Sequence, residues 1–536
     1  MGHNHEREIL NRGIGENTMN KDELLAKQQA EVDSKLWAMA NELRGNMEAS
    51  EFKNYILGLI FYKFLSDKIA DTINKELEDD GITFEDAWQD ESMKDDIREM
   101  SVSVIGYFLD PAYLFDSFVK KIEVNAFTVE DLKEGIKAIT SSTVGSASED
   151  DFADLFEDMD LDDNKLGKGE AERSKLIGKI ILKIKDLNLD LSETNFDVLG
   201  HAYEYLIGKF AASAGKKAGE FYTPAQVSEL LARIVTLENK DLKSAYDPTC
   251  GSGSLLLRVR NNVSNPDTIK LYGQEMVTTT YNLARMNMLL HGVDYEKFNI
   301  ANDDTLDKPS EKHKGLTFDA VVANPPYSAK WDPEGRDADP RFNGYDGKYA
   351  PKSKADYAFV QHMLYHLSDS GTLAVVLPHG VLFRGAAEEV IRTKIIRDFN
   401  YLDAVIGLPA NLFFGTSIPT CVLVMKKCRT HDDVVFIDAS QYFESGKNQN
   451  YLREEDIVRI LDAYKARTDV DKYAHVASLE EIKENDYNLN IPRYVDTFEE
   501  EEPIDIHAVM AEIKELEAKR DALDAEIEKY LKELGL

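Results

Sequence analysis

A four-residue motif in the sequence has residue types suited to activating a weakly nucleophilic amine. It consists of Asn324, Pro325, Pro326 and Tyr327, and it follows the largely apolar run 318–322. An amine conjugated to an aromatic ring or a carbonyl reacts slowly because its lone pair is delocalised. An Asn side-chain oxygen and a proline-fixed backbone carbonyl can accept both N–H hydrogens and draw the nitrogen toward tetrahedral geometry. With Tyr327 stacked on the ring, residues 324–327 are predicted to clamp a planar amine; two prolines that merely close a strand are the alternative.

A glycine-rich turn upstream of this clamp has the features of a ligand-binding loop. It comprises Asp247, Pro248, Thr249, Cys250, Gly251, Ser252, Gly253 and Ser254, and an apolar helix at 255–259 follows it. Glycines let the backbone turn sharply and approach a ligand, and a helix start offers unpaired N–H groups. The pattern is neither the dinucleotide fingerprint nor the phosphate loop. We expect it to hold a nucleotide-like cofactor, and a simple tight connection is the alternative.

Two acidic residues lie between the glycine-rich turn and the clamp. Glu275 ends the next predicted strand, where nucleoside-binding α/β folds carry an acid that accepts hydrogen bonds from ribose hydroxyls. Asp304 lies within 302–306, after a third strand, where a carboxylate can accept a hydrogen bond from an adenine amine. Either acid taken alone is more typical of a surface position. Their placement after the glycine-rich turn favours ligand-binding roles.

Short β-rich runs alternate with helical segments throughout this part of the chain. Strands are predicted at 244–246, 270–273, 320–323, 371–377, 401–407, 420–425 and 434–438. Strands that alternate with helices of this length predict an α/β fold with a doubly wound sheet. Ligands of such a sheet bind at the carboxyl ends of its strands, which is where the clamp and the turn are expected.

The first third of the chain is predicted to be helical. Leu36, Met39, Ala40, Leu43 and Met47 recur at spacings of three and four, and an apolar run at 52–64 predicts a buried helix. We therefore assign 21–145 to an N-terminal helical domain and 173–495 to the α/β domain. The intervening 146–172 is crowded with Asp and Glu and is predicted to be a solvated acidic linker. A calcium loop is excluded because, counted from Asp158, its sixth and twelfth positions hold Asp163 and Gly169.

The last segment, 503–536, has a heptad-like apolar pattern. The apolar positions are Ile506, Val509, Ile513, Leu516, Leu523, Ile527, Tyr530 and Leu534, and Arg520 occupies the remaining slot. Such spacing predicts a coiled-coil-type helix that docks a partner subunit. A helix packed on its own domain is the alternative.

Composition narrows the class of protein. With 536 residues, two or three domains are expected, and no segment reaches the roughly 20 uninterrupted apolar residues of a membrane span. Three cysteines without a CxxC pair argue against disulfides and a zinc site, and indicate a reduced, cytoplasmic protein. Residues 1–20 are predicted to be a disordered tail or a cloning-derived extension, with Met19 as an alternative start and no signal peptide.

The net charge of −35 conflicts with unaided binding of nucleic acid. Affinity for duplex DNA rests largely on Lys and Arg that neutralise phosphates. Either the substrate is not a nucleic acid, or a basic partner supplies most of the affinity.

The motifs together resemble the amino-methyltransferases that use S-adenosylmethionine, and their arrangement resembles the methylation subunit of a type I restriction-modification system. The resemblance spans nearly the whole chain from about Lys21, including 36–65, 220–224, 407–413 and 487–494. It implies a Rossmann-like methyltransferase sheet, preceded by an all-α N-terminal domain and followed by a coiled-coil-type helix. The order of the motifs resembles the subgroup that makes N6-methyladenine in DNA.

The resemblance extends the predicted site. The signature before the glycine-rich turn contacts the cofactor in this family, and Ser252, Gly253 and Glu275 match its other cofactor positions. The predicted cofactor-binding residues are Glu220, Phe221, Tyr222, Thr223, Pro224, Ala225, Asp247, Gly251, Ser252, Gly253, Ser254, Glu275 and Asp304. The predicted catalytic residues are Asn324, Pro325, Pro326 and Tyr327, and no metal is expected. Cys250 departs from the small residues common there and is interpreted as a packing position.

Residues 328–354 are expected to serve the substrate. Their cations alternate with aromatic side chains, so this segment could hold a flipped-out adenine and its flanking phosphates. A disordered surface loop is the alternative.

The resemblance also implies partners. A separate specificity subunit would read the target site, two methylation subunits would clasp duplex DNA around it, and an endonuclease or translocase subunit is a further candidate; no membrane is involved. Alternative functions are methylation of a protein glutamine or an RNA base amine on the same fold, and a scaffold without catalysis.

Overall fold

The computed structural model describes residues 33–38, 40, 49–186, 198–213, 223–413, 416–447, 449–497 and 506–535. The chain divides into two units, Met1–Val495 and Asp496–Leu536. The predictions for residues 1–20 and for Glu220, Phe221 and Tyr222 lie outside the described residues. Within the described ranges, no helix combines the length and the apolar character needed to cross a bilayer.

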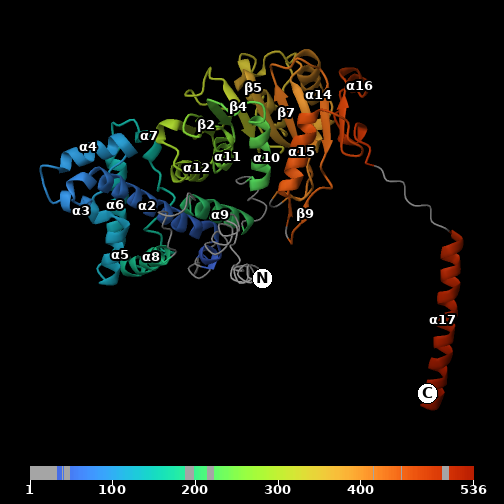
Figure 1. The fold of residues 1–536 in the computed structure, drawn as a ribbon, viewed down its shortest axis with the longest axis horizontal. Coiled ribbons are helices and arrows are strands. Elements are labelled where there is room, and N and C mark those ends of the chain that lie inside the picture. The colour runs from blue at the N-terminus through green and yellow to red at the C-terminus, as the bar shows by residue number, and fades with distance from the viewer. Residues whose placement is uncertain are drawn as a thin grey trace, which may run out of the picture. The chain divides into compact units, whose positions relative to one another are not determined.

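A sheet forms the centre of the first unit (Figure 1). Its strands are β1 (Ser244–Asp247), β2 (Lys270–Gln274), β3 (Phe298–Ala301), β4 (Phe318–Ala323), β5 (Leu367–Pro378), β6 (Leu402–Gly407), β7 (Thr420–Lys426), β8 (Val434–Asp438) and β11 (Ala474–Ala477). Their order is β11-β8-β6-β7-β5-β4-β1-β2-β3. β7 is antiparallel to both β5 and β6, and β11 is antiparallel to β8. The predicted α/β sheet is confirmed, whereas β11 and the hairpin of β9 (Glu444–Ser445) and β10 (Asn450–Tyr451) were not predicted.

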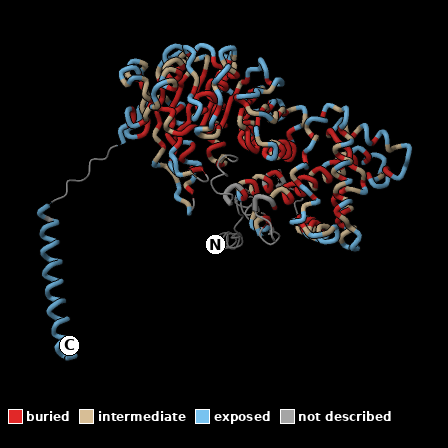
Figure 2. Tube along the Cα trace, turned by 180° about the vertical axis from the view of Figure 1, so that it is seen from behind, coloured by how far each residue is buried: buried red, intermediate tan, exposed pale blue. Residues whose placement is uncertain are grey.

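Helices cover both faces of the sheet, because its strands alternate between two apolar clusters. In β4, Ala320 and Val322 belong to one cluster, and Val321 and Ala323 belong to the other. The first cluster includes apolar residues of α10 (Ala225–Val235), α11 (Ser254–Asn262), α12 (Thr278–Leu290) and α15 (Glu454–Ala466). The second includes residues of α13 (Asp356–His366), α14 (Ala387–Thr393) and α16 (Leu479–Glu484). The sheet is therefore doubly wound, and its strands are almost wholly buried (Figure 2).

The N-terminal region is helical, as predicted. Its helices are α2 (Ala49–Glu76), α3 (Phe84–Ala87), α4 (Lys94–Ile105), α5 (Phe115–Glu123), α6 (Val129–Ser142), α7 (Glu149–Phe152), α8 (Glu170–Lys185) and α9 (Val198–Ser213). Short 3-10 turns lie in this region at Glu78–Asp80 and Pro111–Tyr113. In the α/β part of the chain they lie at Tyr295–Lys297, Pro340–Phe342, His379–Leu382 and Ile491–Arg493, and a π-helix lies at Lys394–Asp398. The buried side chains of α2 belong to the same cluster as one face of the sheet.

The segment 146–172 is not a solvated linker. Its buried apolar residues are Phe152, Leu155, Phe156, Met159, Leu161 and Leu166. The ring of Phe156 lies 5.6 Å from that of Phe61 on α2, and the hydroxyl of Tyr55 donates to the carbonyl of Asp160 at 2.8 Å. The solvated-linker prediction is wrong here because the density of acids obscured apolar residues spaced one to five apart. The predicted domain boundaries themselves stay predictions.

Arg285 on α12 fastens this acidic segment to the α/β part of the chain. Its side chain is buried, and Nη1 donates to the carbonyls of Asp150 at 2.8 Å and Ala153 at 2.9 Å. Nη2 donates to Oδ1 of Asn282 at 2.7 Å, and Asn282 in turn donates to the carboxylate of Asp158 at 3.0 Å. Burial lowers the pKa of Arg285 and raises the pKa of Asp151 to about 7. The helical region is thus joined to α12 by a buried polar network as well as by apolar contacts.

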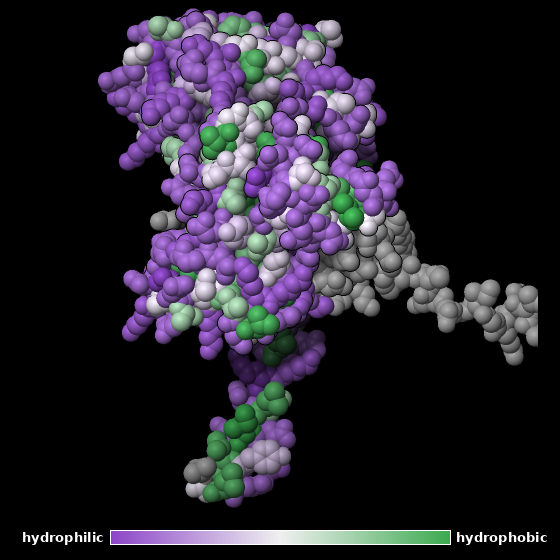
Figure 3. Space-filling view, turned by 90° about the vertical axis from the view of Figure 1, so that its left-hand side faces the viewer, coloured by the Kyte–Doolittle hydropathy of each residue, from purple (hydrophilic) through white to green (hydrophobic). Residues whose placement is uncertain are grey.

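The second unit contains the helix α17 (Ile506–Glu533), which confirms the predicted helix. The large apolar side chains of α17, and Leu534 just after it, are exposed: Ile506, Val509, Met510, Ile513, Leu516, Leu523, Ile527, Tyr530, Leu531 and Leu534. In Figure 3, hydrophobic residues form a green band along the helix. Docking of a partner on this band stays a prediction.

We predict that replacing Arg285 with Met destabilises the folded chain by about 3 kcal/mol, because several buried acceptors lose a charged donor. Thermal unfolding of the two purified proteins measures this change. Lys314→Ala, at a solvent-exposed ion pair with Glu311, is the matched control and should shift stability by less than about 0.5 kcal/mol. Equal melting temperatures for wild type and Arg285→Met would contradict the role of the buried network.

Candidate functional site

The carboxyl ends of β1, β2, β3 and β4 surround a pocket of about 190 Å³. The order of the sheet reverses between β1 and β4, so the loops that follow these two strands diverge and leave a crevice. Four predicted site residues line this pocket together: Glu275, Asp304, Asn324 and Pro326. The sequence motifs therefore converge at one end of the sheet, as their positions after strands predicted.

The glycine-rich turn has the backbone geometry that its composition predicted. Gly251 and Gly253 have φ angles of 54° and 77°, in the left-handed region. A Cβ atom on Gly253 would lie 2.7 Å from the terminal methyl of Met288, so no larger residue fits without a shift. The hydroxyls of Ser252 and Ser254 lie 3.0 Å apart. Cys250 is buried, which raises the pKa of its thiol, and this supports a packing position rather than a nucleophile.

Two buried carboxyl groups lie beside this turn. Asp247 is 2% exposed and Glu275 is 8% exposed. Asp247 accepts a hydrogen bond from the N–H of Thr249 at 2.9 Å, and Glu275 accepts from Gly251 at 3.1 Å and Val277 at 2.8 Å. Burial, together with the negative charge of Glu275, raises the pKa of Asp247 to about 7, and burial also raises the pKa of Glu275. A ligand with positive charge or hydroxyl donors would relieve this unfavourable concentration of acids.

Asp304 reaches the pocket from the loop after β3. Its Oδ1 accepts hydrogen bonds from the N–H groups of Leu306 at 2.8 Å and Asp307 at 3.0 Å. The hydroxyl of Thr305 donates to the carbonyl of Pro248 at 2.5 Å, which ties this loop to the glycine-rich turn. The loop is therefore shaped by local hydrogen bonds that hold the Asp304 carboxylate at the pocket.

The clamp is built on three linked side chains. Nδ2 of Asn324 donates to Oγ1 of Thr223 at 3.1 Å, and the hydroxyl of Tyr327 donates to Oδ1 of Asn324 at 2.8 Å. The ring of Tyr327 lies edge-on to Phe413, with centroids 6.1 Å apart. Burial raises the pKa of Tyr327 well above its ordinary value, so this hydroxyl stays neutral and can donate. Thr223 and Tyr327 thus hold the two ends of the Asn324 amide.

Other predicted site residues lie on the elements that frame the pocket. Pro224 is the N-cap of α10, which begins at Ala225. Pro325 is buried between Asn324 and Pro326. Their predicted roles depend on ligands and stay predictions.

Two aromatic residues in the pocket were not assigned to it from the sequence. Trp331 is held by hydrogen bonds from Nε1 to the carbonyls of Ala350 at 3.2 Å and Pro351 at 3.1 Å. Phe359, on α13, is 6% exposed and lines the same pocket. Such rings can contact a planar group. The sequence did indicate Trp331, because it belongs to the segment 328–354 in which cations alternate with aromatic side chains. Phe359 has the sequence pattern of an ordinary core residue of a helix.

The segment 328–354 is a packed loop, and the surface-disorder alternative is wrong. Phe342 and Tyr345 are buried, and the guanidinium of Arg341 donates to the carbonyls of Thr305 and Leu306, each at 2.8 Å. Several of its cations pair with acids: Arg336 with Asp307, Arg341 with Asp339, and Lys352 with Glu334. This pairing reduces the positive charge that the loop can offer to phosphates.

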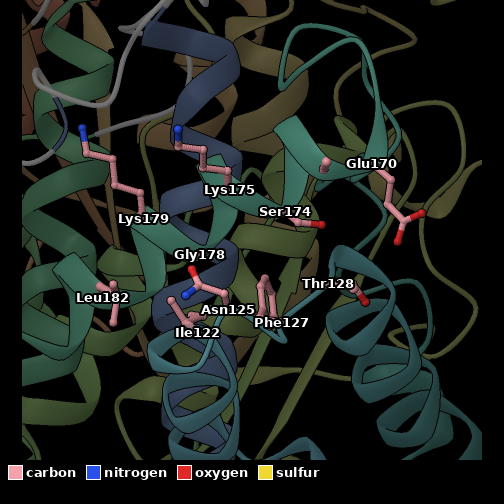
Figure 4. A pocket seen from close by; sticks show the side chains of 11 residues that line it. Ile122, Asn125, Phe127, Thr128, Glu170, Ser174, Lys175, Gly178, Lys179 and Leu182 are labelled. Carbon is pink, nitrogen blue, oxygen red and sulfur yellow. The ribbon is translucent and has the colours of Figure 1, made fainter.

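A larger groove, of about 930 Å³, lies in the helical region. Figure 4 shows Asn125 and Phe127, from the turn between α5 and α6, opposite Gly178 on α8. None of the predicted site residues lines this groove. The pocket at the carboxyl ends of the strands is therefore the candidate site.

Comparisons with known proteins agree with this geometry. The N-6 DNA Methylase family profile matches residues 194–503, and the HsdM N-terminal domain profile matches residues 32–184. The Type I restriction enzyme MpnII methylase subunit of Mycoplasma pneumoniae is 37% identical over 529 residues, which cover 95% of this chain and 97% of that protein. The Type I restriction enzyme HindI methylase subunit of Haemophilus influenzae is 32% identical over 416 residues, covering 71% of this chain and 91% of that protein.

A solved structure extends the similarity to three dimensions. The crystal structure of the type I restriction-modification system methyltransferase subunit from Streptococcus thermophilus has a TM-score of 0.81 and 44% sequence identity. The match covers 87% of this chain and 100% of that chain.

The buried carboxyl of Asp247 should link stability to pH. Its pKa is about 7 in the folded chain against an ordinary value of 3.8, so the folded state binds more protons between these pH values. The free energy of unfolding therefore falls as the pH rises through this window. We predict that Asp247→Asn removes this loss. The free energy of unfolding of the variant, relative to that of wild type, should therefore rise by roughly 2–3 kcal/mol as the pH increases from about 5 to 8.

Urea unfolding across this pH range measures the difference. Asp303→Asn changes an exposed acid of a neighbouring loop and serves as the control. A gain for Asp247→Asn that does not vary with pH would show that Asp247 is not the titrating group.

Proposed function

Because the chain belongs to the N-6 DNA Methylase family, and within it to the methylase subunits of type I restriction enzymes, we propose that it transfers a methyl group to N6 of a flipped-out adenine in DNA. The observation that carries this proposal is the shared pocket. Two acids suited to a nucleoside cofactor, Glu275 and Asp304, and two members of the amine clamp, Asn324 and Pro326, line one cavity. Methyl donor and amine acceptor would therefore meet without any rearrangement of the sheet.

The cofactor is S-adenosylmethionine, and when bound it supplies an electrophilic methyl group on a positively charged sulfur. The residues fit this molecule because the buried carboxyls of Asp247 and Glu275 have raised pKa values that a cationic ligand with ribose hydroxyls would lower. In our proposal, the glycine-rich turn, Asp247 and Glu275 hold its charged and ribose parts. Asp304 would accept from its adenine amine, and Phe359 would contact the ring.

The clamp would act on the target amine by position and electrostatics. Oδ1 of Asn324 and the carbonyl of Pro325 would accept the two N6 hydrogens, localise the nitrogen lone pair and stabilise the positive charge that develops there. In this structure, the Tyr327 hydroxyl donates to the same Oδ1. A carbonyl oxygen has two lone pairs, so the amine can use the second, while the Tyr327 ring stacks on the base. The extra proton then leaves the nitrogen for solvent.

The specificity of the reaction would come from other subunits. The net charge of −35 and the internal pairing of the cations in loop 328–354 leave this chain poorly suited to bind DNA alone. We propose that a specificity subunit reads the target, that two copies of this chain assemble with it on duplex DNA, and that α17 docks through its exposed apolar band. An endonuclease or translocase subunit would join the same complex.

The proposal predicts that Asn324→Ala lowers methyl transfer by about 10²–10³-fold, because one preorganised acceptor is lost. Transfer from labelled S-adenosylmethionine to duplex DNA, with the specificity subunit present, measures the rate, and digestion to nucleosides identifies N6-methyladenine. Cofactor binding should change by less than about threefold. Label found only in protein glutamine or in RNA would favour the alternative substrates, and unchanged transfer by Asn324→Ala would refute the role of the clamp.

A second prediction separates the ring of Tyr327 from its hydroxyl. Tyr327→Phe keeps stacking and should retain activity within about tenfold, whereas Tyr327→Ala should lose roughly 10–100-fold, the value of one base–aromatic stack. Single-turnover methyl transfer distinguishes the two. If both variants lose activity equally, the hydroxyl rather than the ring is the functional group.

A further inference from the structure

We infer that Phe383 is the side chain that enters the DNA base stack when the target adenine leaves it. This inference rests on the proposed function, because it concerns how the duplex is opened for the clamp. Phe383 is 48% exposed. Among the phenylalanines whose side chains the structure describes, it is the one in the exposed class. A half-exposed aromatic ring is free on one side to stack on a flat apolar face of a partner.

The loop that carries Phe383 is held rigidly. It follows β5 at the carboxyl edge of the sheet, and the flanking Val381 and Leu382 are fully buried. The carbonyl of Val381 accepts the hydroxyl of Tyr357 at 2.9 Å, and the carbonyl of Leu382 accepts the N–H of Leu489 at 2.9 Å. The backbone that leads into the exposed ring is therefore fixed, which suits a wedge that must push between bases.

The loop is also coupled directly to the amine clamp. The guanidinium of Arg384 pairs with the carboxylate of Asp356, whose side chain is 0% exposed. Oδ1 of the same carboxylate accepts the N–H of Ser328 at 2.8 Å. Ser328 follows Tyr327, and Arg384 follows Phe383, so a single buried carboxylate joins the two loops. Since β4 and β5 are adjacent and parallel, both loops leave the sheet at the same edge.

The chemistry of the ring matches the space that flipping creates. Extruding an adenine leaves a gap between two base pairs and an unpaired partner base, both of which present flat apolar faces. Aromatic stacking fills such a gap without reading sequence and without neutralising phosphates. This mode of contact is available to a chain whose net charge is −35. Met276 and Ile418 are also exposed at this edge, but neither has a ring to stack, and Met276 already lines the cofactor pocket.

The test uses the complex of the full chain with its specificity subunit and two duplexes. In one duplex, the target adenine pairs with thymine; in the other, it lies opposite an abasic site, so less stacking and pairing must be broken. We expect Phe383→Ala to lower methyl transfer to the paired adenine by about 10–100-fold and to the adenine opposite the abasic site by less than about threefold. Phe383→Trp should retain transfer to both. The matched control is Val458→Ala, an exposed apolar residue of α15, which should change neither rate.

A fluorescence measurement checks the step itself. With 2-aminopurine in place of the target adenine, the wild-type complex should raise the emission on binding, and Phe383→Ala should reduce that rise. Equal losses on both duplexes would overturn the inference, as would loss of co-purification with the specificity subunit, which would identify Phe383 as a protein contact. A wild-type complex inactive on both duplexes would instead overturn the proposed function, and this inference with it.

Discussion

The reversal of strand order between β1 and β4 is the constraint on which the site depends. Because β2 and β3 extend the sheet on one side and β5 and its successors extend it on the other, the loops after β1 and β4 turn away from each other. The glycine-rich turn and the Asn324 clamp occupy these two loops and face a common pocket. Burial of both sheet faces holds the strands in register, so the relative positions of the glycine-rich turn and the clamp are set by the core.

The short motifs could be located from sequence because two independent criteria agreed. Their residue types suit ligand binding, and they follow strands, where ligands of such a sheet bind. Gly253 needs a left-handed backbone, and Asn324 follows an apolar strand, so neither depends on distant residues. Phe359 could not be assigned in this way, because only the three-dimensional packing of α13 brings a helical core residue to the pocket. The hydrogen bond between Thr223 and Asn324 was equally inaccessible, since it joins two motifs about 100 residues apart in the chain.

Charge was the least reliable guide to structure. The acids of 146–172 suggested a solvated linker, yet Phe156 and Met159 from the same segment are buried against α2. The cations of 328–354 suggested a phosphate-binding loop, yet the guanidinium of Arg341 donates to backbone carbonyls and pairs with Asp339. In both segments, a count of charges missed the apolar residues and the local pairs that decide the fold. Net charge remains informative about partners, because it acts over distances at which individual pairs no longer matter.

The helix α12 has a mechanical consequence. Arg285 holds the acidic segment of the helical region, and two residues later Nδ2 of Asn287 donates to the carbonyl of Ser252 at 3.0 Å, within the glycine-rich turn. One helix therefore carries both anchor points, two residues apart, and a displacement of one is transmitted to the other without passing through the sheet. By reciprocity, whatever free energy the occupied turn transmits to the helical region, movement of that region transmits back to the turn. Movement of the helical region is in this sense expected to change how the glycine-rich turn binds its ligand.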